Sequence, residues 1–303
     1  MINIILYTKN GQLANRLLQL CSFITFADQC NVKIWYPGFE DYAYLFEEYH
    51  KTIIPTYPQT NNYLPLTIVK PCRRLTFNLI YYIVRIVDKL GLKESHFHKI
   101  VNINENDNSN RLNQEFLNTL SNKKFIFIEN WAFAPDYYSK ESLENVLNNT
   151  KFLPSYYVEA NELIEEIRQK DEAIRIVGVH VRRGDYKEFE DGRYFYPISS
   201  YLGWMKQVKN LLGKDVTFIL SSNEDLKSAE EIVNCDLVIK HAQGHLITDL
   251  ITLSKCDFII APPSTYSMWA SFKGKVPLQM IRSSNHLLEL EKFQVFAPGQ
   301  KHK

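Results

Sequence analysis

The chain has 303 residues, of which 45% are hydrophobic and 23% charged, and its 35 basic and 34 acidic side chains leave a net charge of +1. This length and apolar content are sufficient for two domains of ordinary size. The near-zero net charge excludes a global field that would attract nucleic acid, so we expect no nucleic-acid partner and any anion site to be local.

Segments typical of strands and helices alternate along the chain, which favours an α/β fold with parallel sheets. The first unit is predicted to run from a strand over 2–7, through a turn at 8–12, to a helix over 13–30 and a strand over 32–36. The five cysteines include no Cys-x-x-Cys pair, which fits a reduced compartment. The first residues lack the basic start of a signal peptide. We therefore expect a cytoplasmic protein, either free or peripheral at the inner face of the cytoplasmic membrane.

The longest apolar run outside these segments covers residues 75–87. It is interrupted by Arg85 and is shorter than the roughly 20 residues that a membrane-spanning helix needs. Residues 70–99 contain seven Lys or Arg against two acidic residues, a surplus of five. Two interpretations stay open: a core helix of the first domain with a basic edge, or a helix that lies on an anionic membrane surface.

The next stretch, 101–111, is rich in asparagine and is expected to be an exposed loop. Residues 125–129 predict a later strand of the first domain. A charged amphipathic helix over 157–170 then leads into a new strand at Ile174. We place the domain boundary there, with an N-terminal domain over 1–170 and a C-terminal domain over 171–303.

The apolar run 174–179 is typical of a parallel strand buried on both faces, and it is followed at once by His180-Val181-Arg182-Arg183-Gly184-Asp185-Tyr186. Open α/β sheets bind ligands beyond such strand ends. Strand alternation puts His180 and Arg182 on one side and Arg183 on the other, so the two arginines should have different roles. The planar guanidinium of Arg182 suits a diphosphate. The alternative is that both arginines pair with Asp185 or nearby glutamates.

Further strands are predicted over 216–220, 237–240 and 258–261, with helices between them. The segment 249–260 is predicted to be a helix that continues into the last of these strands. Asp249 is predicted to lie beside the buried apolar stripe of that helix. Its carboxylate either reaches a ligand or is a solvated acid in a first helical turn, where negative charge is favoured.

Hydroxyl side chains follow the strand over 258–261. Ser264 or Thr265 is expected to cap the next helix, and a helix N-terminus with unpaired backbone N–H groups favours phosphate. The hydroxyl of Ser267 adds a donor near the same point. A plain helix cap without a ligand is the alternative.

Four short blocks of this sequence resemble a known family. The motif His-x-Arg-Arg-x-Asp at 180–185 resembles the hallmark of fucosyltransferases that use GDP-fucose, and its full form is most similar to glycosyltransferase family 11, the α1,2-fucosyltransferases. The runs 249–257 and 264–269 are similar to two further family segments, and 11–16 to the glycine turn of the first domain. Pro263, Met268 and Ala270 depart from the family pattern. These departures affect the assignment of the α1,2 linkage more than the assignment of GDP-fucose as donor.

This resemblance implies a GT-B-like fold of two Rossmann-like domains with parallel sheets facing a cleft, with GDP held by the C-terminal domain. The implied reaction is inverting, metal-independent transfer of L-fucose from GDP-fucose to a hydroxyl of a glycan or lipid-linked glycan acceptor, α1,2 to galactose in a bacterial surface polysaccharide. The implied donor-binding residues are Gly11, Asn15, His180, Arg182, Arg183, Asp249, Ser264, Thr265 and Ser267. Asp249 would read the guanine base.

The sequence contains no Asp-x-Asp, so we expect no metal cofactor and assign neutralisation of the leaving diphosphate to Arg182. A carboxylate is expected to take the proton of the acceptor hydroxyl. Asp185 and Glu188 are the first candidates, with Glu190 and Asp191 also open, and Asp185 is as well explained as a partner of Arg183. The alternatives are transfer from a different nucleotide-sugar donor, or a non-catalytic protein that binds sugar nucleotides or glycans.

Overall fold

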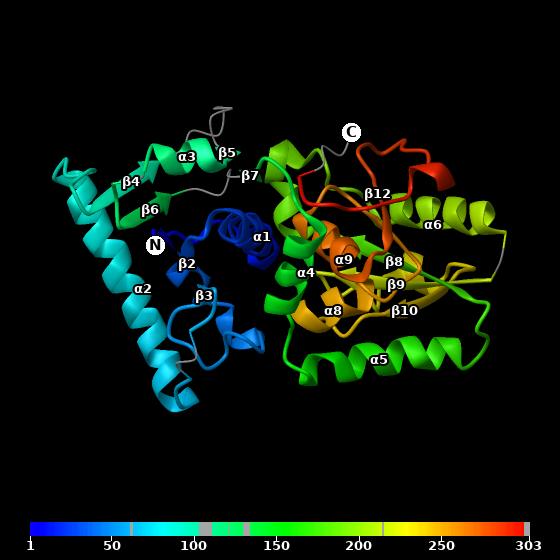
Figure 1. The fold of residues 1–303 in the computed structure, drawn as a ribbon. Coiled ribbons are helices and arrows are strands. Elements are labelled where there is room, and N and C mark those ends of the chain that lie inside the picture. The colour runs from blue at the N-terminus through cyan, green and yellow to red at the C-terminus, as the bar shows by residue number, and fades with distance from the viewer. Residues whose placement is uncertain (61–62, 103–110, 121, 130–133, 214, 300–303) are drawn as a thin grey trace. The chain divides into compact units, whose positions relative to one another are not determined.

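The computed structural model describes residues 1–60, 63–102, 111–120, 122–129, 134–213 and 215–299. The chain divides into two compact units, Met1–Leu153 and Pro154–Lys303. Each unit is built around one mainly parallel sheet with helices on its faces (Figure 1). The predicted α/β class with parallel sheets is therefore confirmed, whereas the predicted cleft stays a prediction. Most of the asparagine-rich stretch lies outside the described residues.

The first unit contains the larger elements β1 (Asn3–Leu6), α1 (Leu13–Cys30), β2 (Lys33–Trp35), β3 (Thr56–Tyr57), α2 (Leu66–Lys89), β4 (His98–Asn102), β6 (Phe125–Glu129) and α4 (Lys140–Asn149). Shorter elements are η1 (Pro37–Phe39), η2 (Ala43–Leu45), β5 (Arg111–Leu112), α3 (Gln114–Asn118) and β7 (Ala134–Pro135). The sheet has the order β3-β2-β1-β6-β4, in which only β3 is antiparallel to its neighbour.

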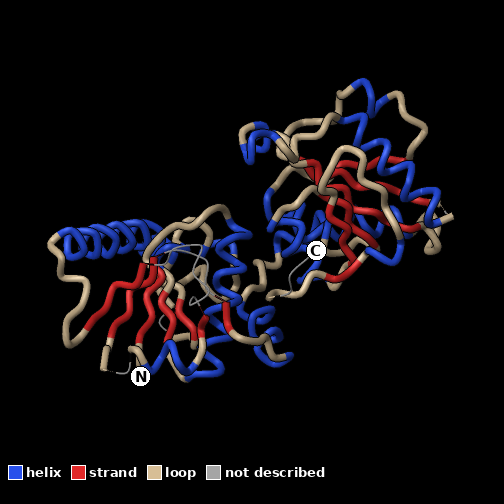
Figure 2. Tube along the Cα trace, turned by 90° about the horizontal axis from the view of Figure 1, so that it is seen from above, coloured by secondary structure: helices blue, strands red, loops and turns tan. Residues whose placement is uncertain are grey.

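Helices cover both faces of this sheet (Figure 2). One face packs on α2, where Val84 contacts a cluster that includes Ile5, Tyr7 and Ile100. The side chains of alternate β1 residues, Ile4 and Leu6, are also buried, because strand side chains alternate between faces and α1 lies against the other face. The run predicted over 75–87 is thus part of a longer helix on the sheet.

The second unit contains α5 (Ser155–Arg168), β8 (Arg175–Val181), α6 (Ile198–Leu212), β9 (Val216–Ser222), β10 (Val238–His241), α8 (Leu246–Leu253), β11 (Phe258–Ala261), α9 (Thr265–Gly274) and β12 (Pro277–Met280). Shorter elements are η3 (Gly184–Lys187), η4 (Phe189–Gly192), α7 (Glu230–Val233), η5 (Leu290–Lys292) and β13 (Gln294–Val295). The sheet order is β10-β9-β8-β11-β12-β13, and only β13 is antiparallel.

The strand order of the second unit reverses between β8 and β11, because β9 and β10 lie on one side of β8 and β11 and β12 on the other. In open α/β sheets such a switch point is where ligands bind, beyond the carboxyl ends of the strands. β8 is buried on both faces, as predicted: Val177 and Val179 pack on the α6 side, and Ile176 on the α5 side. The residues that follow β8 and β11 therefore lie next to each other, beyond the carboxyl ends of these two strands.

Helix α5 differs from its predicted assignment, because it lies in the second unit. Its Ile167 packs with Ile176 of β8 and Cys256, and the guanidinium of Arg168 donates to both carboxylate oxygens of Asp257 at 2.8 and 2.7 Å. The boundary between the units thus falls at 153/154 rather than at 170, since the apolar side of α5 covers the second sheet.

Candidate functional site

The predicted site residues of the second unit gather at the carboxyl edge of its sheet. Arg182 and Arg183 follow β8, Asp249 lies in the first turn of α8, and Ser264 precedes α9 after β11. Hydrogen bonds join these segments: the Tyr186 hydroxyl donates to the carbonyl of Pro263 at 2.6 Å. The loop after β8 is therefore fixed against the turn after β11, across the switch point.

His180 is buried and its Nδ1 lies 2.7 Å from the Ser267 hydroxyl oxygen. The Tyr266 ring packs beside the imidazole, with centroids 5.0 Å apart. Burial, and secondarily the positive charge of Arg182, lower the pKa of His180 to about 3. The imidazole is therefore neutral near pH 7, and its contacts position the end of β8 rather than provide a proton carrier.

Arg182 forms an ion pair with Asp185, with 2.7 Å between Nη2 and Oδ2. The side chain of Arg182 is 18% exposed and that of Asp185 is 50% exposed. The Tyr186 ring lies under the guanidinium, 5.4 Å from Cζ to the ring centroid. A carboxylate and an aromatic ring thus hold this cation at the sheet edge, and Asp185 pairs with Arg182 and not with Arg183.

Arg183 has a different set of contacts, which agrees with the prediction that the two arginines differ. Its Nε donates to Glu224 at 3.0 Å, its Nη1 donates to the carbonyl of Tyr196 at 3.1 Å, and its guanidinium lies over the Phe195 ring. Glu224 also accepts from the backbone N–H of Gly184 at 3.0 Å. Arg183 therefore connects the loop after β8 to the residues after β9, and its side chain is engaged within the unit.

Asp249 is only 4% exposed, so of the two alternatives left open for this residue the solvated acid is wrong. One carboxylate oxygen accepts from the Ser221 hydroxyl at 3.2 Å, and the other accepts from the backbone N–H of Gly244 at 3.0 Å. Burial raises the pKa of Asp249 to about 6, while these hydrogen bonds act in the opposite direction. Asp249 is therefore ionised at neutral pH in a largely dehydrated position.

The N-terminus of α9 has the predicted cap. Ser264 has extended backbone geometry and its hydroxyl accepts from the N–H of Tyr266 at 3.3 Å, while Thr265 is the first helical residue. The Tyr266 hydroxyl donates to the carbonyl of Leu246 at 2.6 Å, which links α9 to the start of α8. Tyr186 and Tyr266 were not among the predicted site residues, although both lie inside the motifs that resemble the family.

The remaining candidate bases lie in the loop over 188–191. Glu188, Glu190 and Asp191 are all exposed. Glu190 and Asp191 have left-handed backbone angles, and a carboxylate oxygen of Glu190 lies 3.9 Å from the guanidinium of Arg193. Exposure keeps each of these carboxylates accessible to an acceptor hydroxyl.

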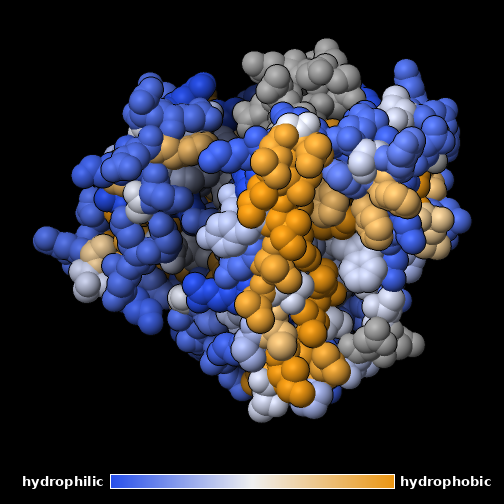
Figure 3. All heavy atoms as spheres, turned by 90° about the vertical axis from the view of Figure 1, so that its left-hand side faces the viewer, coloured by the Kyte–Doolittle hydropathy of each residue, from blue (hydrophilic) through white to orange (hydrophobic). Residues whose placement is uncertain are grey.

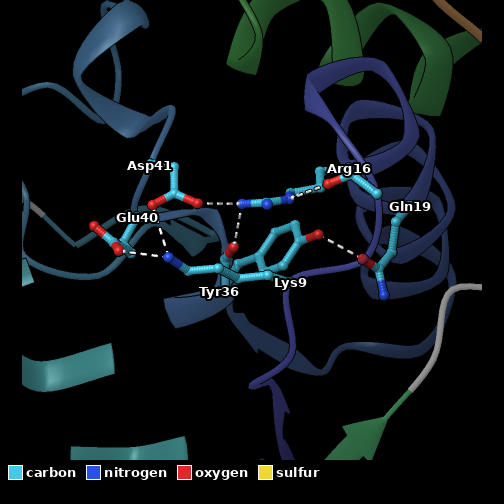
Figure 4. A network of polar contacts seen from close by, with 8 residues as sticks. Lys9, Arg16, Gln19, Tyr36, Glu40 and Asp41 are labelled. Atoms are coloured by element: carbon cyan, nitrogen blue, oxygen red, sulfur yellow. Dashed lines mark hydrogen bonds and ion pairs between the residues drawn. The ribbon is translucent and has the colours of Figure 1, made fainter. Parts of the chain in front are cut away.

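Gly11 and Asn15 lie in the first unit, where the structure brings them into contact. Gly11 has a φ of +64°, and the amide of Asn15 occupies the space that a Cβ of residue 11 would fill. Arg16, which was not among the predicted site residues, donates to the carbonyls of Gly11 and Gly38 and pairs with Asp41 at 3.2 Å (Figure 4). The turn before α1 is thus fixed by a buried arginine.

Among the described residues, no three His, Cys, Asp or Glu side chains come close enough to hold a metal ion. In the same part of the chain, no helix has the length and apolar character needed to cross a bilayer.

A doubly wound sheet with an arginine and a helix N-terminus at its switch point is typical of proteins that bind nucleotides. Two solved structures have a similar fold. A mutant of FUT1 from Arabidopsis thaliana in complex with GDP has a TM-score of 0.53 and 12% identity, over 92% of this chain and 70% of that chain. The fucosyltransferase NodZ from Bradyrhizobium has a TM-score of 0.50 and 15% identity, over 92% and 95%. The fold is therefore GT-B-like.

Residues 137–281 match the family model "Glycosyl transferase family 11", which confirms the resemblance found in the sequence. The matched segment includes every predicted site residue except Gly11 and Asn15. A search of curated proteins found no match. Fold and family match together identify the chain as a glycosyltransferase.

Proposed function

We propose that this glycosyltransferase moves L-fucose from GDP-fucose to a hydroxyl of a glycan acceptor, with inversion and without a metal ion. The observation that carries the proposal is the joint position of Arg182 and the α9 N-terminus at the β8/β11 switch point, tied together by Tyr186 and Pro263. The complex of the Arabidopsis FUT1 mutant with GDP, a protein of similar fold, and the family match support the choice of donor.

In this reaction the bond between the fucose C1 and the β-phosphate oxygen breaks, and the acceptor oxygen bonds to C1 from the opposite face. GDP leaves with increased negative charge on its β-phosphate. Arg182 is assigned to that charge, because a fixed guanidinium stabilises it more in the transition state than in the ground state. The N–H groups at the start of α9, with the hydroxyls of Ser264 and Thr265, would bind the same diphosphate.

Asp249 is assigned to the guanine base. A carboxylate has about four lone-pair positions; Ser221, Gly244 and the backbone of His245 use three of them, and the remaining position can accept a hydrogen of the guanine edge. His180 and Ser267 would keep β8 and α9 in register beneath the diphosphate. Arg183 would act by positioning the Gly184 turn through Glu224. Gly11 and Asn15 stay predicted donor contacts of the first unit.

The acceptor proton is assigned to a carboxylate of the segment 185–191. Four variants separate the candidates: Asp185→Asn, Glu188→Gln, Glu190→Gln and Asp191→Asn. Loss of the base should lower the turnover number and leave GDP-fucose binding intact. Asp185→Asn should weaken donor binding as well if its main contribution is to orient Arg182.

The test is an assay of the purified chain with GDP-fucose, EDTA and a panel of galactose-terminated glycans. We expect release of GDP together with a fucosylated product, with α1,2 linkage to galactose. GDP-mannose and UDP-galactose serve as competing donors. Transfer from either of them but not from GDP-fucose would contradict the assigned donor. Activity that returns only on addition of a divalent ion would contradict the metal-independent mechanism, and nucleotide binding without any transfer would indicate a binding protein.

A further inference from the structure

Helix α2 has one apolar face buried and a second apolar face exposed. Val69, Phe77 and Val84 are buried, and Val84 packs with residues of the sheet. The exposed face carries the apolar stripe of α2, defined by six residues with exposed fractions between 48% and 68%: Ile68, Leu75, Leu79, Tyr82, Ile83 and Ile86. Their spacings of three, four and seven residues are those of a single helix face. From the sequence, this helix was either a core helix with a basic edge or a helix on a membrane surface. The structure places the apolar stripe at the surface of the protein.

Figure 3 shows this stripe as a continuous hydrophobic band along the helix. The stripe runs from Ile68 to Ile86 of this helix, so the band extends over roughly 27 Å at 1.5 Å per residue. Leu90, Leu92 and Phe97 continue the exposed apolar surface beyond the helix end. Single exposed apolar side chains are ordinary, but a contiguous band of this extent marks an interaction surface.

Polar contacts on the opposite side keep the stripe facing outward. Arg85 forms a two-point ion pair with Glu129, at 3.1 and 2.5 Å, and Glu129 also accepts from the Tyr7 hydroxyl at 3.0 Å. Nearer the start of the helix, the buried Arg73 donates to the carbonyls of Tyr49 and Thr52. Rotation of α2 to bury the stripe would break both anchors.

The charge around the stripe is positive. Lys70, Arg74 and Lys89 are exposed on α2, and Lys93 follows its end. The two carboxylates of 70–99 are each neutralised by lysine: Asp88 pairs with Lys93 at 3.3 Å, and Glu94 pairs with Lys99 at 3.4 Å and Lys123 at 3.0 Å. An apolar face bordered by excess basic charge complements an anionic lipid surface, into which such helices insert parallel to the plane.

We propose that the apolar stripe of α2 docks the protein on membranes that contain anionic lipids, with the helix in the interface plane. This inference goes beyond sugar transfer and does not depend on it. The stripe would enter the boundary between headgroups and acyl chains, and the neighbouring basic side chains would contact phosphate groups. A glycosyltransferase held in this way would work at the surface where lipid-linked acceptors lie.

Co-sedimentation of the full chain with vesicles tests the proposal. The vesicles contain either phosphatidylcholine alone or phosphatidylcholine mixed with phosphatidylglycerol. We expect binding to the mixed vesicles, weaker binding to phosphatidylcholine, and a decrease with added salt. The variant Leu75→Gln/Leu79→Gln/Ile83→Gln should lower the partition coefficient at least about tenfold, because it removes the inserted apolar surface. Arg74→Gln/Lys89→Gln should lower it roughly tenfold on the mixed vesicles only.

Matched controls use exposed residues of the second unit. Val233→Gln/Val238→Gln/Leu287→Gln and Lys206→Gln/Lys209→Gln remove the same kinds of group elsewhere and should bind like the wild type. Thermal melting of every variant checks folding, which these exposed substitutions should leave intact. Failure of the wild type to bind mixed vesicles, or equal loss in the control variants, would overturn the proposal. Self-association through the stripe without vesicle binding, detected by analytical ultracentrifugation, would overturn it as well. None of these readouts requires a fucose donor. A negative result would therefore contradict membrane docking without contradicting the proposed sugar transfer.

Discussion

The imidazole Nδ1 of His180 lies 2.7 Å from the hydroxyl of Ser267, and this bond joins the carboxyl end of β8 to the first turn of α9. Both segments border the switch point of the second sheet, so the bond fixes the distance between Arg182 and the helix N-terminus. The site is therefore organised by a neutral, buried imidazole.

This burial predicts a particular pH dependence of stability. The folded-state pKa of His180 is lowered to about 3 from an ordinary value of 6.5, so its contribution to folding is present above pH 6.5 and is lost as the pH falls toward 3. His180→Gln removes the titration. Chemical denaturation between pH 7 and pH 5 should show the stability advantage of the wild type over His180→Gln shrinking as the pH falls. An advantage that grows in that range would show that the imidazole is charged in the folded state.

Asp249 should give the opposite dependence. Its folded-state pKa is raised to about 6 from 3.8, so stability from the protonated form is present below pH 3.8 and is lost as the pH rises through 6. This loss amounts to roughly 3 kcal/mol. Relative to the wild type, Asp249→Asn should gain stability between pH 4 and pH 6, with no further change above. The exposed Asp215→Asn is the control, and a parallel gain in that variant would rule out Asp249 as the source.

Replacement of Arg182 should affect the chemical step. Arg182→Ala is expected to lower kcat/KM for GDP-fucose by about 100-fold or more, equivalent to about 3 kcal/mol, as for the loss of comparable transition-state donors. Arg193→Ala is the matched control, since Arg193 is an exposed arginine of the same loop, paired at 3.9 Å with Glu190. Steady-state assays of GDP release measure both, and a similar decrease in the two variants would indicate a general charge effect.

Gly274 sets how closely α8 and α9 pack. A Cβ at this position would lie 1.9 Å from the backbone oxygen of Ser254, whereas a Cβ at Gly203, within α6, would meet nothing within 4 Å. Gly274→Ala should therefore cost about 1–3 kcal/mol or more of unfolding free energy. Gly203→Ala should stabilise by roughly 0.5–1 kcal/mol, because glycine is unfavourable inside a helix. Urea denaturation compares them, and equal stability of the two variants would contradict the packing described for α8 and α9.

Much of the fold followed from periodicity and apolar runs. The predicted bounds of α1, β6 and β11 agree with the structure, because each is a regular segment bordered by clear turn residues. The sequence predicted less of α2, since Thr67 and Pro71 interrupt the apolar run at its start although the helix begins at Leu66. It assigned α5 to the wrong unit because an amphipathic pattern does not say which sheet a helix covers.

The candidate site was predictable as a set of motifs but not as a set of contacts. The position of Arg182 after a buried strand and the cap at Ser264 follow from local pattern alone. The partner of Arg183 does not, because Glu224 lies 41 residues away in the chain. The burial of Asp249 depends likewise on Ser221 and Gly244, which the chain brings together only on folding.

The most direct test of the account is a comparison of GDP-fucose binding by the wild type and by Arg182→Ala, measured by thermal shift in EDTA beside GDP-mannose, UDP-galactose and ATP. We expect the largest rise in melting temperature with GDP-fucose, and we expect Arg182→Ala to reduce this rise and Arg193→Ala to retain it. A preference for UDP-galactose or ATP, or a shift with GDP-fucose that Arg182→Ala leaves unchanged, would contradict the assignment of the diphosphate to Arg182.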